Sequence, residues 1–314
     1  MSNEVMSPAQ LGLGINPILT TVAQGYANAE FVGSVLFPRV PVSSRAGQIM
    51  TFGKESFKLY NARRAPGAAT KRLNVGYAGD PFVLVQDALE AVVPRENQQE
   101  AQSIAGVDLA GIHVETVMRA LYLGLEYEQA TLARNPAKYA AGSKVALTGT
   151  NKWDSPSSDP IADVSNAREA VRARIGQYPT TLVLGAKVMA ALKRHPKIIE
   201  RIKYTQFAAV SEAMLAELFE VATVKVAKAV IAGDDDVFSD IWGNDAVLAY
   251  VPAQVSSIIQ PSYGYTYTLN GNPLVENAYT EHNAKSEVYG VTFERAPVMA
   301  GADSGFLFQN VVGA

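Results

Sequence analysis

The chain has 314 residues, no cysteine and a formal net charge of -3. Its length allows one large domain or two ordinary ones with a sizeable core, and 48% apolar with 18% charged residues argues against global disorder. The lack of cysteine excludes disulfides, thiolate nucleophiles and cysteine-ligated zinc, and the small net charge argues against a dedicated nucleic-acid binder. No signal peptide or membrane-length apolar run is present, which predicts a soluble intracellular product.

Residues 1–47 carry short apolar clusters without a sustained period. Prolines at positions 8, 17, 38 and 41 interrupt these clusters. We expect an extended arm that is held by the surface on which it lies. An N-terminal edge strand is the alternative interpretation.

Two β-like segments, 49–60 and 73–85, flank a turn-forming stretch of small residues. This pattern predicts a long projecting hairpin. From Ser56 to Gly79 there are five cations and no acid. The tip is either a solvated surface or a docking element for an acidic surface of another subunit, and contact with nucleic acid is a third alternative. The candidate inter-subunit residues are Arg63, Arg64, Lys71 and Arg72.

The stretch from Arg95 to Asn135 has the period of a helix with one apolar stripe. Pro94 precedes it and Pro136 bars its continuation. A continuous helix here would be about 60 Å long at about 1.5 Å per residue. Glycines cost up to about 1 kcal/mol each in a helix interior, which predicts a bend or an irregular first third. The stripe contains Val107, Val114, Met118, Leu121, Leu125 and Leu132, and the glycines are Gly106, Gly111 and Gly124.

The remaining chain mixes helices and strands without a regular alternation, so the predicted class is α+β. Asp163 is the expected cap of a helix over residues 164–175. Further helices are predicted at 186–194, 197–204 and 212–219. Strands are predicted from residue 144 and at 178–185, 223–231, 246–251, 261–270, 285–295 and 305–312.

Catalytic and metal-binding patterns are sparse. We expect structural roles for His113, His195 and His282, which lack the partners of a zinc or catalytic motif. The turn at Gly185, between a strand and a helix, has a form that can bind anions, but with a single glycine. Residues 234–236 are three aspartates without the other residues of a calcium loop, which favours a solvated loop. We therefore predict no catalytic, cofactor-binding or metal-binding residues, and a protein that is not an enzyme.

An ordered series of short motifs resembles the major capsid proteins of tailed bacteriophages. The series runs from Trp153 to Val251. It consists of Trp153-Asp154, Ser158-Asp159-Pro160-Ile161-Ala162-Asp163, Pro179 to Gly185, Ala191-Leu-Lys-Arg-His195-Pro196, Arg201 to Thr205, Leu215 to Phe219 and Ile241-Trp242-Gly243. The residues that we take as family motif positions are Trp153, Asp154, Asp159, Pro160, Asp163, His195, Pro196 and Trp242.

The resemblance implies the Hong Kong 97-type capsid fold. Its parts would be an N-terminal arm (1–47), an extended hairpin loop (48–94), a peripheral domain with a long spine helix (95–160 and 280–300) and an axial domain (161–279), to which 301–314 is a candidate addition. The glycines at 106 and 111 become candidate points where the spine bends as a shell matures.

The implied function is self-assembly into hexamers and pentamers of an icosahedral shell that encloses double-stranded DNA. We expect non-specific DNA contact, a separate scaffolding protein, a portal, a candidate decoration protein, no cofactor, no membrane and no lysine-asparagine crosslink. The protein would be made in the bacterial cytoplasm and reside in the virion. An encapsulin-type compartment shell is the alternative, and a phosphate-ligand-binding protein or enzyme is the third. We expect removal of residues 1–40 or 55–78 to stop assembly while leaving the core folded.

Overall fold

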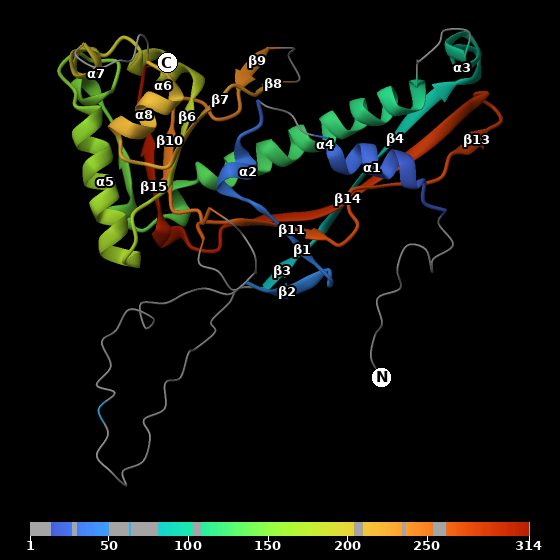
Figure 1. The fold of residues 1–314 in the computed structure, drawn as a ribbon, viewed down its shortest axis with the longest axis horizontal. Coiled ribbons are helices and arrows are strands. Elements are labelled where there is room, and N and C mark those ends of the chain that lie inside the picture. Colours follow the sequence, from blue (N-terminus) through green and yellow to red (C-terminus); the bar gives the residue numbers. More distant parts are fainter. Residues whose placement is uncertain are drawn as a thin grey trace.

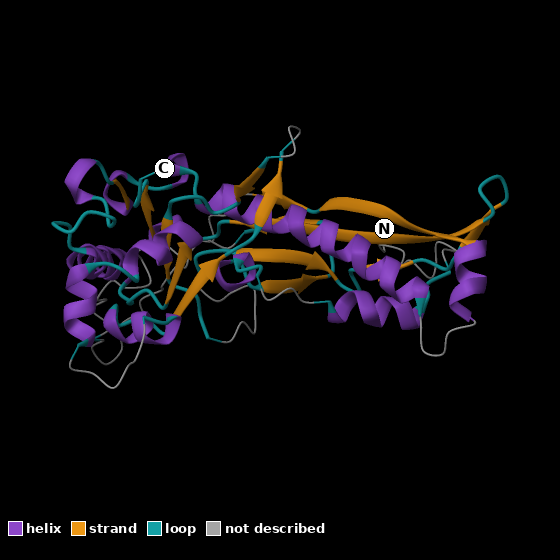
Figure 2. Ribbon diagram, turned by 90° about the horizontal axis from the view of Figure 1, so that it is seen from above, coloured by secondary structure: helices purple, strands orange, loops and turns teal. Residues whose placement is uncertain are grey.

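The computed structural model describes residues 14–26, 30–49, 63, 81–102, 108–203, 210–233, 237–253 and 262–313. The body is elongated, with one sheet toward each end and the long helix α4 (Leu109–Ala133) running between them (Figure 1). Figure 2 shows the strands of the larger sheet running along α4. The helix therefore contacts both halves of the protein.

Five strands form a mixed sheet at one end of the body. Their order is β5 (Lys144–Ala146), β15 (Gly305–Gln309), β10 (Ala246–Ala249), β6 (Thr181–Gly185) and β7 (Thr223–Ala227). Both faces are covered, which explains the continuous apolar run of β6. Leu182 and Leu184 face helices α5 (Pro160–Ile175), α6 (Ala186–Leu192), α7 (Pro196–Ile202) and α8 (Glu212–Leu218). Val183 faces α2 (Gly33–Leu36) and the end of α4.

Six strands form the second sheet, which is built on the long strand β14 (Ser286–Val298). Its other strands are β1 (Arg39–Val42), β11 (Tyr265–Leu269), β12 (Leu274–Val275), β13 (Tyr279–Glu281) and β4 (Val85–Pro94). β4 runs antiparallel to β14, from the pair Pro94–Ser286 to the pair Val85–Arg295. The apolar stripe of α4 and helix α1 (Pro17–Gly25) pack on this sheet. Met118, Leu121 and Phe293 belong to the same buried cluster.

Short elements complete the described fold. Two small antiparallel pairs are β2 (Ala46–Gln48) with β3 (Pro81–Val83) and β8 (Val230–Ala232) with β9 (Phe238–Asp240). Single 3-10 turns are η2 (Pro136–Lys138), η3 (Ala141–Ser143), η4 (Gly149–Asn151) and η5 (Ala302–Ser304).

The predicted helix from Arg95 to Asn135 is interrupted. Helix α3 covers Arg95–Gln102, and Asp108 is extended (φ -100°, ψ 93°) and caps α4 by accepting the Gly111 N–H at 3.1 Å. The prediction of a bend or an irregular first third is confirmed, because extended Asp108 separates α4 from α3. The 25 residues of α4 are about 38 Å long at about 1.5 Å per residue.

Gly124 lies at an exposed position inside α4. A Cβ there would meet only Arg295 Nη2, at 3.5 Å, an ordinary contact. We expect Gly124→Ala to raise the free energy of unfolding by about 0.5–1 kcal/mol, because alanine restricts the unfolded chain and favours the helix. Chemical denaturation of the full chain would measure the change. Gly111→Ala is the control, since its Cβ would lie 2.6 Å from Asp108 Oδ2 and should bring no gain. A loss of stability in Gly124→Ala would contradict the expectation.

Two predicted boundaries were wrong in the part after α4. The cap of α5 is Asp159, which accepts the Ala162 N–H at 3.1 Å, because Pro160 already occupies the first helical position. Asp163 instead accepts the indole N–H of Trp153. The single strand predicted at 223–231 is divided into β7 and β8, since the latter pairs with β9 and not within the five-stranded sheet.

The N-terminal part is more regular than the expected extended arm. It contains α1, α2 and β1, and β1 is an edge strand that pairs in parallel with β11. Leu36 and Phe37 are fully buried. The sequence predicts a core that stays folded without residues 1–40, whereas this burial leads us to expect that their removal would destabilise the core.

Most of the predicted hairpin, residues 50–62 and 64–80, lies outside the described residues, as do the aspartates at 234–236. Within the described residues, β4 of the predicted loop is part of the six-stranded sheet, residues 265–298 also join that sheet, and β15 joins the five-stranded one. The assignment of these segments to peripheral and axial domains stays a prediction. None of the helices in the described ranges has both the length and the apolar character to cross a membrane.

Candidate functional site at helix α4

A buried carboxylate on α4 holds the N-terminal segment against the five-stranded part. Glu126 is 2% exposed, and its Oε1 accepts the Val32 N–H at 3.0 Å and the indole N–H of Trp242 at 2.7 Å. Its Oε2 accepts the Gly33 N–H at 2.9 Å. Burial raises the pKa of Glu126, and these three hydrogen bonds oppose the rise. One side chain thus joins α4, the start of α2 and the loop before β10.

Gln129 extends this polar contact by one helical turn. Its Nε2 donates to Thr266 Oγ1 at 2.8 Å, and that hydroxyl donates to the Phe37 carbonyl at 3.0 Å. A Cβ at Gly33 would lie 2.0 Å from Gln129 Oε1 and 2.8 Å from Glu126 Oε2, so any larger residue would displace these two side chains from their hydrogen bonds. We call Glu126 and Gln129, with Val32, Gly33, Trp242 and Thr266, the α4 clasp.

The C-terminal end of α4 is anchored separately. Arg134 donates from Nε to Asp245 Oδ2 at 2.7 Å and from Nη1 to the Ile241 carbonyl at 2.8 Å. The second oxygen of Asp245 accepts the Asn310 N–H at 2.9 Å. The helix end, the loop before β10 and the chain after β15 are therefore fixed together.

A buried arginine links α4 to the six-stranded sheet. Arg295 of β14 is 2% exposed and bonds Asp87 of β4 and Glu128 of α4, each at 2.7 Å. Its guanidinium also lies over the Phe293 ring, 5.4 Å from the centroid. The neighbouring residue Glu294 accepts two hydrogen bonds from Arg45, at 2.6 and 2.8 Å. These contacts fix the β1–β2 turn and β4, which flank the β2–β3 pair in the sequence.

The motif residues of the sequence series mainly fix the surroundings of α5. Trp153 is fully buried, and its indole donates to Asp163 Oδ2 at 2.9 Å. Burial raises the pKa of Asp163, and the indole bond opposes this. Asp154 Oδ2 accepts the Gly313 N–H at 2.8 Å, and the Val311 carbonyl accepts the Trp153 N–H. These two backbone contacts attach Val311 and Gly313, near the C-terminus, to the residues before α5.

The second group of motif residues starts α7. His195 is 3% exposed, immediately precedes Pro196 at the first position of α7, and its Nε2 lies 3.1 Å from Ser158 Oγ. Its Nδ1 has no hydrogen-bond partner among the described residues. The Ser155 carbonyl oxygen also lies 3.2 Å from Nε2, and among the described residues no side chain takes the Nδ1 position of the third member of a catalytic triad.

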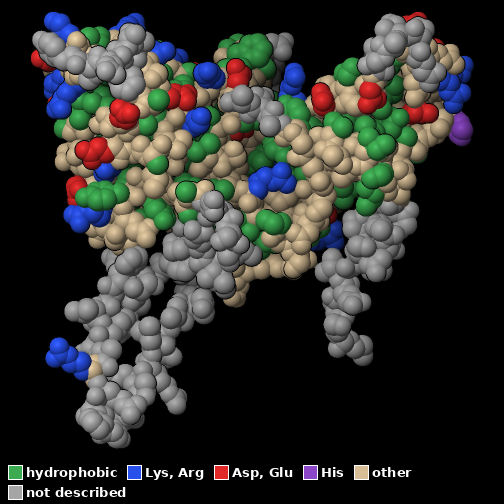
Figure 3. All heavy atoms as spheres, in the orientation of Figure 1, with side chains coloured by type: hydrophobic (Ala, Val, Ile, Leu, Met, Phe, Trp, Pro, Cys, Tyr) green, Lys and Arg blue, Asp and Glu red, His purple; other side chains and the backbone are tan. Residues whose placement is uncertain are grey.

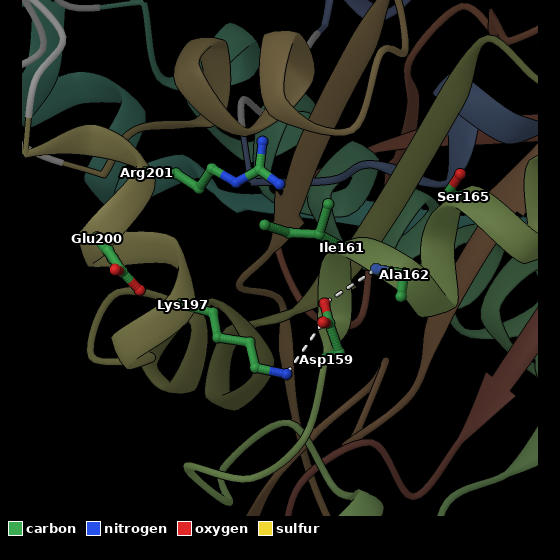
Figure 4. A pocket seen from close by; sticks show the side chains of 7 residues that line it. All are labelled: Asp159, Ile161, Ala162, Ser165, Lys197, Glu200 and Arg201. Atoms are coloured by element: carbon green, nitrogen blue, oxygen red, sulfur yellow. Dashed lines mark hydrogen bonds and ion pairs between the residues drawn. The ribbon is translucent and has the colours of Figure 1, made fainter.

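A pocket of about 610 Å³ lies between the start of α5 and α7. Figure 4 shows Lys197 and Arg201 reaching toward it from α7. Asp159 accepts the Ala162 N–H and, at 2.9 Å, a hydrogen bond from Lys197 Nζ. These bonds hold the pKa of the Asp159 carboxyl below its ordinary value, with the Ala162 N–H as the larger cause.

The other sequence candidates are placed as follows. Arg63 belongs to the described residues, while Arg64, Lys71, Arg72 and Gly106 do not. Gly111 lies in the first turn of α4, next to the interruption after α3, and its role in bending stays a prediction. His113 lies on α4 and His282 is exposed in the turn after β13. A Cβ at Gly185 would lie 2.0 Å from the Gly243 carbonyl oxygen, so backbone already fills the turn considered for anion binding.

Of the clasp residues, sequence reasoning singled out Trp242 as a motif position, which proves to donate to Glu126, but it missed the others and Arg295. One signal was present for the clasp: Glu126 and Gln129 continue the apolar stripe of Met118, Leu121 and Leu125 at helical spacing. Polar side chains on a buried stripe require partners, and this is the feature that marks them. Arg295 had no comparable local signal.

The two sheets bridged by α4 make up the Hong Kong 97-type fold that solved phage capsid proteins share. The chain belongs to the family described as phage major capsid protein E, whose profile matches residues 139–300. It is 39% identical to the major capsid protein of Burkholderia phage BcepMu over 95% of this chain and 97% of that one. Membership places it in the virion capsid as a structural protein of an oligomeric shell.

Two solved structures bear on the alternatives. The crystal structure of a phage-related protein from Bordetella bronchiseptica RB50 is 44% identical, covers 96% of this chain and 99% of that chain, and superposes with a TM-score of 0.85. An encapsulin complex from Synechococcus elongatus is 11% identical, with a TM-score of 0.55 over 91% of this chain and 89% of that chain. The encapsulin likeness shows the fold alone.

Proposed function

We propose that this chain closes its shell by docking the basic segment between Ser56 and Gly79 of one copy on the acidic end of the next copy. The observation that carries the proposal is the charge of the end formed by α3, β4 and β13. In α3, β4 and residues 276–287, glutamates stand at positions 90, 96, 100, 276, 281 and 287, and the lysines and arginines are Arg95 and Lys285. Figure 3 shows acidic side chains on this end of the body.

Contacts between α3, β4, β13 and β14 support a single acidic surface. Tyr279 of β13 donates to Glu90 of β4 at 3.1 Å, and Gln98 of α3 donates to Glu287 of β14 at 3.1 Å. The segment from Ser56 to Gly79 carries five cations and no acid. Opposite charges on two parts of one chain favour a contact between copies that repeats around a ring.

A shell of identical copies also requires a subunit whose body keeps one shape. The α4 clasp and Arg295 support this, because they hold the two sheets to α4. Identical copies in pentamers and hexamers must share slightly unequal contacts, and a body whose two sheets are held by buried charged groups confines the adjustment to other segments. We propose that the hairpin loop and the glycines at 106 and 111 supply that adjustment.

Charge reversal tests the docking contact. We expect Arg64→Glu with Lys71→Glu and Arg72→Glu to stop shell formation in the full chain, because the two surfaces then repel. Adding Glu90→Lys, Glu96→Lys and Glu281→Lys should restore it. Negative-stain electron microscopy gives the readout, and thermal unfolding checks that each variant is folded. Normal shells from the first variant would overturn the proposal, and so would assembly that the second set does not restore.

We further propose a genome of double-stranded DNA inside the shell, synthesis in the bacterial cytoplasm, and no catalytic role. A scaffolding protein, a portal and a decoration protein are the other partners that we propose from the resemblance. Recovered particles that contain an enzyme in place of DNA would instead favour the encapsulin-type alternative.

A further inference from the structure

A group of cations surrounds α7, at the opposite end of the body from the acidic surface. From Lys187 to Lys203 the chain has six cations and one acid, Glu200, although Lys and Arg total 27 and Asp and Glu total 30 overall. Five of the six lie between the end of α6 and the end of α7. We call Lys193, Arg194, Lys197, Arg201 and Lys203 the α7 basic patch.

The patch is exposed and only partly neutralised. Lys197 is paired with Asp159, and Arg194 donates to the Ala190 carbonyl at 3.2 Å. The side chains of Lys193, Arg201 and Lys203 are exposed and make no hydrogen bond or ion pair to the described residues. Figure 3 shows Lys and Arg side chains gathered at the corner where Figure 1 places α7.

The core fixes the direction in which the patch points. Ile198 of α7 is fully buried against the five-stranded sheet, which turns the opposite face of the helix outward. Lys197 and Arg201 are one helical turn apart and both reach over the pocket beside α5 (Figure 4). Neighbouring cations repel each other, so a bound polyanion would lower the electrostatic free energy of the patch.

We infer that the α7 basic patch binds the phosphate backbone of duplex DNA, an inference that rests on the proposed function as a DNA-enclosing shell. Residues 187–203, the described part of this stretch, contain no Phe, Tyr or Trp, so they offer charge without the stacking side chains that read single strands. Ile199 is its large exposed apolar side chain, whereas a protein-binding surface has an apolar centre. These features favour a sequence-independent, salt-dependent contact with phosphates.

The test compares two triple variants of the full chain with the same change in net charge. The first is Lys193→Gln, Arg201→Gln and Lys203→Gln. The matched control is Arg119→Gln, Lys138→Gln and Lys228→Gln, three exposed cations elsewhere on the described surface. Binding to a short mixed-sequence DNA duplex is followed by fluorescence anisotropy at several salt concentrations. Circular dichroism checks the fold, and Lys193→Arg with Lys203→Arg should bind as the unaltered chain does.

We expect the patch variant to bind at least about tenfold more weakly and to lower the slope of log affinity against log salt by about 2–3, with a change under about 1 for the control. Equal losses in both variants would overturn the inference, since only bulk charge would matter. Unchanged DNA binding with lost shell formation would also overturn it and assign the patch to a contact between subunits. A third outcome is that the unaltered chain forms no shells, while the patch variant loses DNA binding and the control variant keeps it. That result would refute the proposed function and support the patch as a DNA-binding surface.

Discussion

Glu126→Ala is expected to lower the free energy of unfolding by about 3–5 kcal/mol and to stop shell formation. The substitution leaves the N–H groups of Val32, Gly33 and Trp242 buried without an acceptor and removes the side chain that fills the space between them. It also detaches α2 from α4. Urea denaturation measures the loss of stability, and sedimentation of the full chain measures assembly.

Glu126→Gln separates the charge from the shape. The glutamine oxygen can keep the bonds from Val32 and Trp242, but its amide nitrogen then faces the Gly33 N–H, donor against donor. We expect a loss of about 1–3 kcal/mol. An alanine variant that loses less than about 1 kcal/mol and still assembles would show that the clasp does not hold the N-terminal segment.

The pH dependence of these variants has a defined sign. Because burial raises the pKa of Glu126 above its ordinary value of 4.5, the folded chain binds the proton more readily than the unfolded chain. The contribution of this group to stability is therefore complete below the unfolded-state pKa and declines as pH rises through the folded-state pKa. The free energy of unfolding of the native chain should therefore approach that of Glu126→Gln as the pH rises from the unfolded-state pKa to the folded-state pKa of Glu126. A gap that widens would contradict the raised pKa.

Arg295→Ala is the second large effect, with an expected loss of about 3 kcal/mol. Removing the guanidinium deprives Asp87 and Glu128 of their shared cation, ends its contact with the Phe293 ring and leaves a cavity. The loss should be local to the sheet under α4. Hydrogen exchange is the direct measurement: amides of β4 should exchange faster, while those of β10 keep their protection.

Arg39→Ala is a matched control for this variant. Arg39 lies over the same Phe293 ring, 5.5 Å from the centroid, but it is exposed and donates to the Tyr122 hydroxyl and the Asn272 carbonyl, not to two carboxylates. Its removal should cost under about 1 kcal/mol. Equal losses from the two arginines would show that ring contact, and not the buried pairing with α4 and β4, accounts for the effect of Arg295.

Prediction from the sequence succeeded where the determining pattern is local. Strand β6 is recognisable because Leu182, Val183 and Leu184 form a short apolar run that ends at Gly185, and α4 because its apolar residues recur at helical spacing. It failed at choices between adjacent candidates, such as Asp159 and Asp163 as the cap of α5. Both carboxylates can accept a backbone N–H at the start of a helix. Asp159 does so, whereas Asp163 accepts the buried indole N–H of Trp153.

The N-terminal segment shows a different limit. Helices α1 and α2 have nine and four residues and were missed, since short helices in water depend on packing more than on propensity. The buried residues of α1 and α2 pack against α4 and against strands of the two sheets. Most of those residues come much later in the chain. Nothing within residues 14–49 specifies that surface.

By itself the sequence determined the α+β class, the stripe of α4, the strands of the buried sheet and the ordered motifs from Trp153 to Val251 that resemble phage capsid proteins. Only the tertiary structure decided which polar groups meet on the buried face of α4. Glu126 bonds Val32 across 94 positions, and Arg295 bonds Asp87 across 208. Periodicity specifies which face of an element is buried, whereas the partner of a buried charge depends on how distant elements pack, and that information is spread over the whole chain.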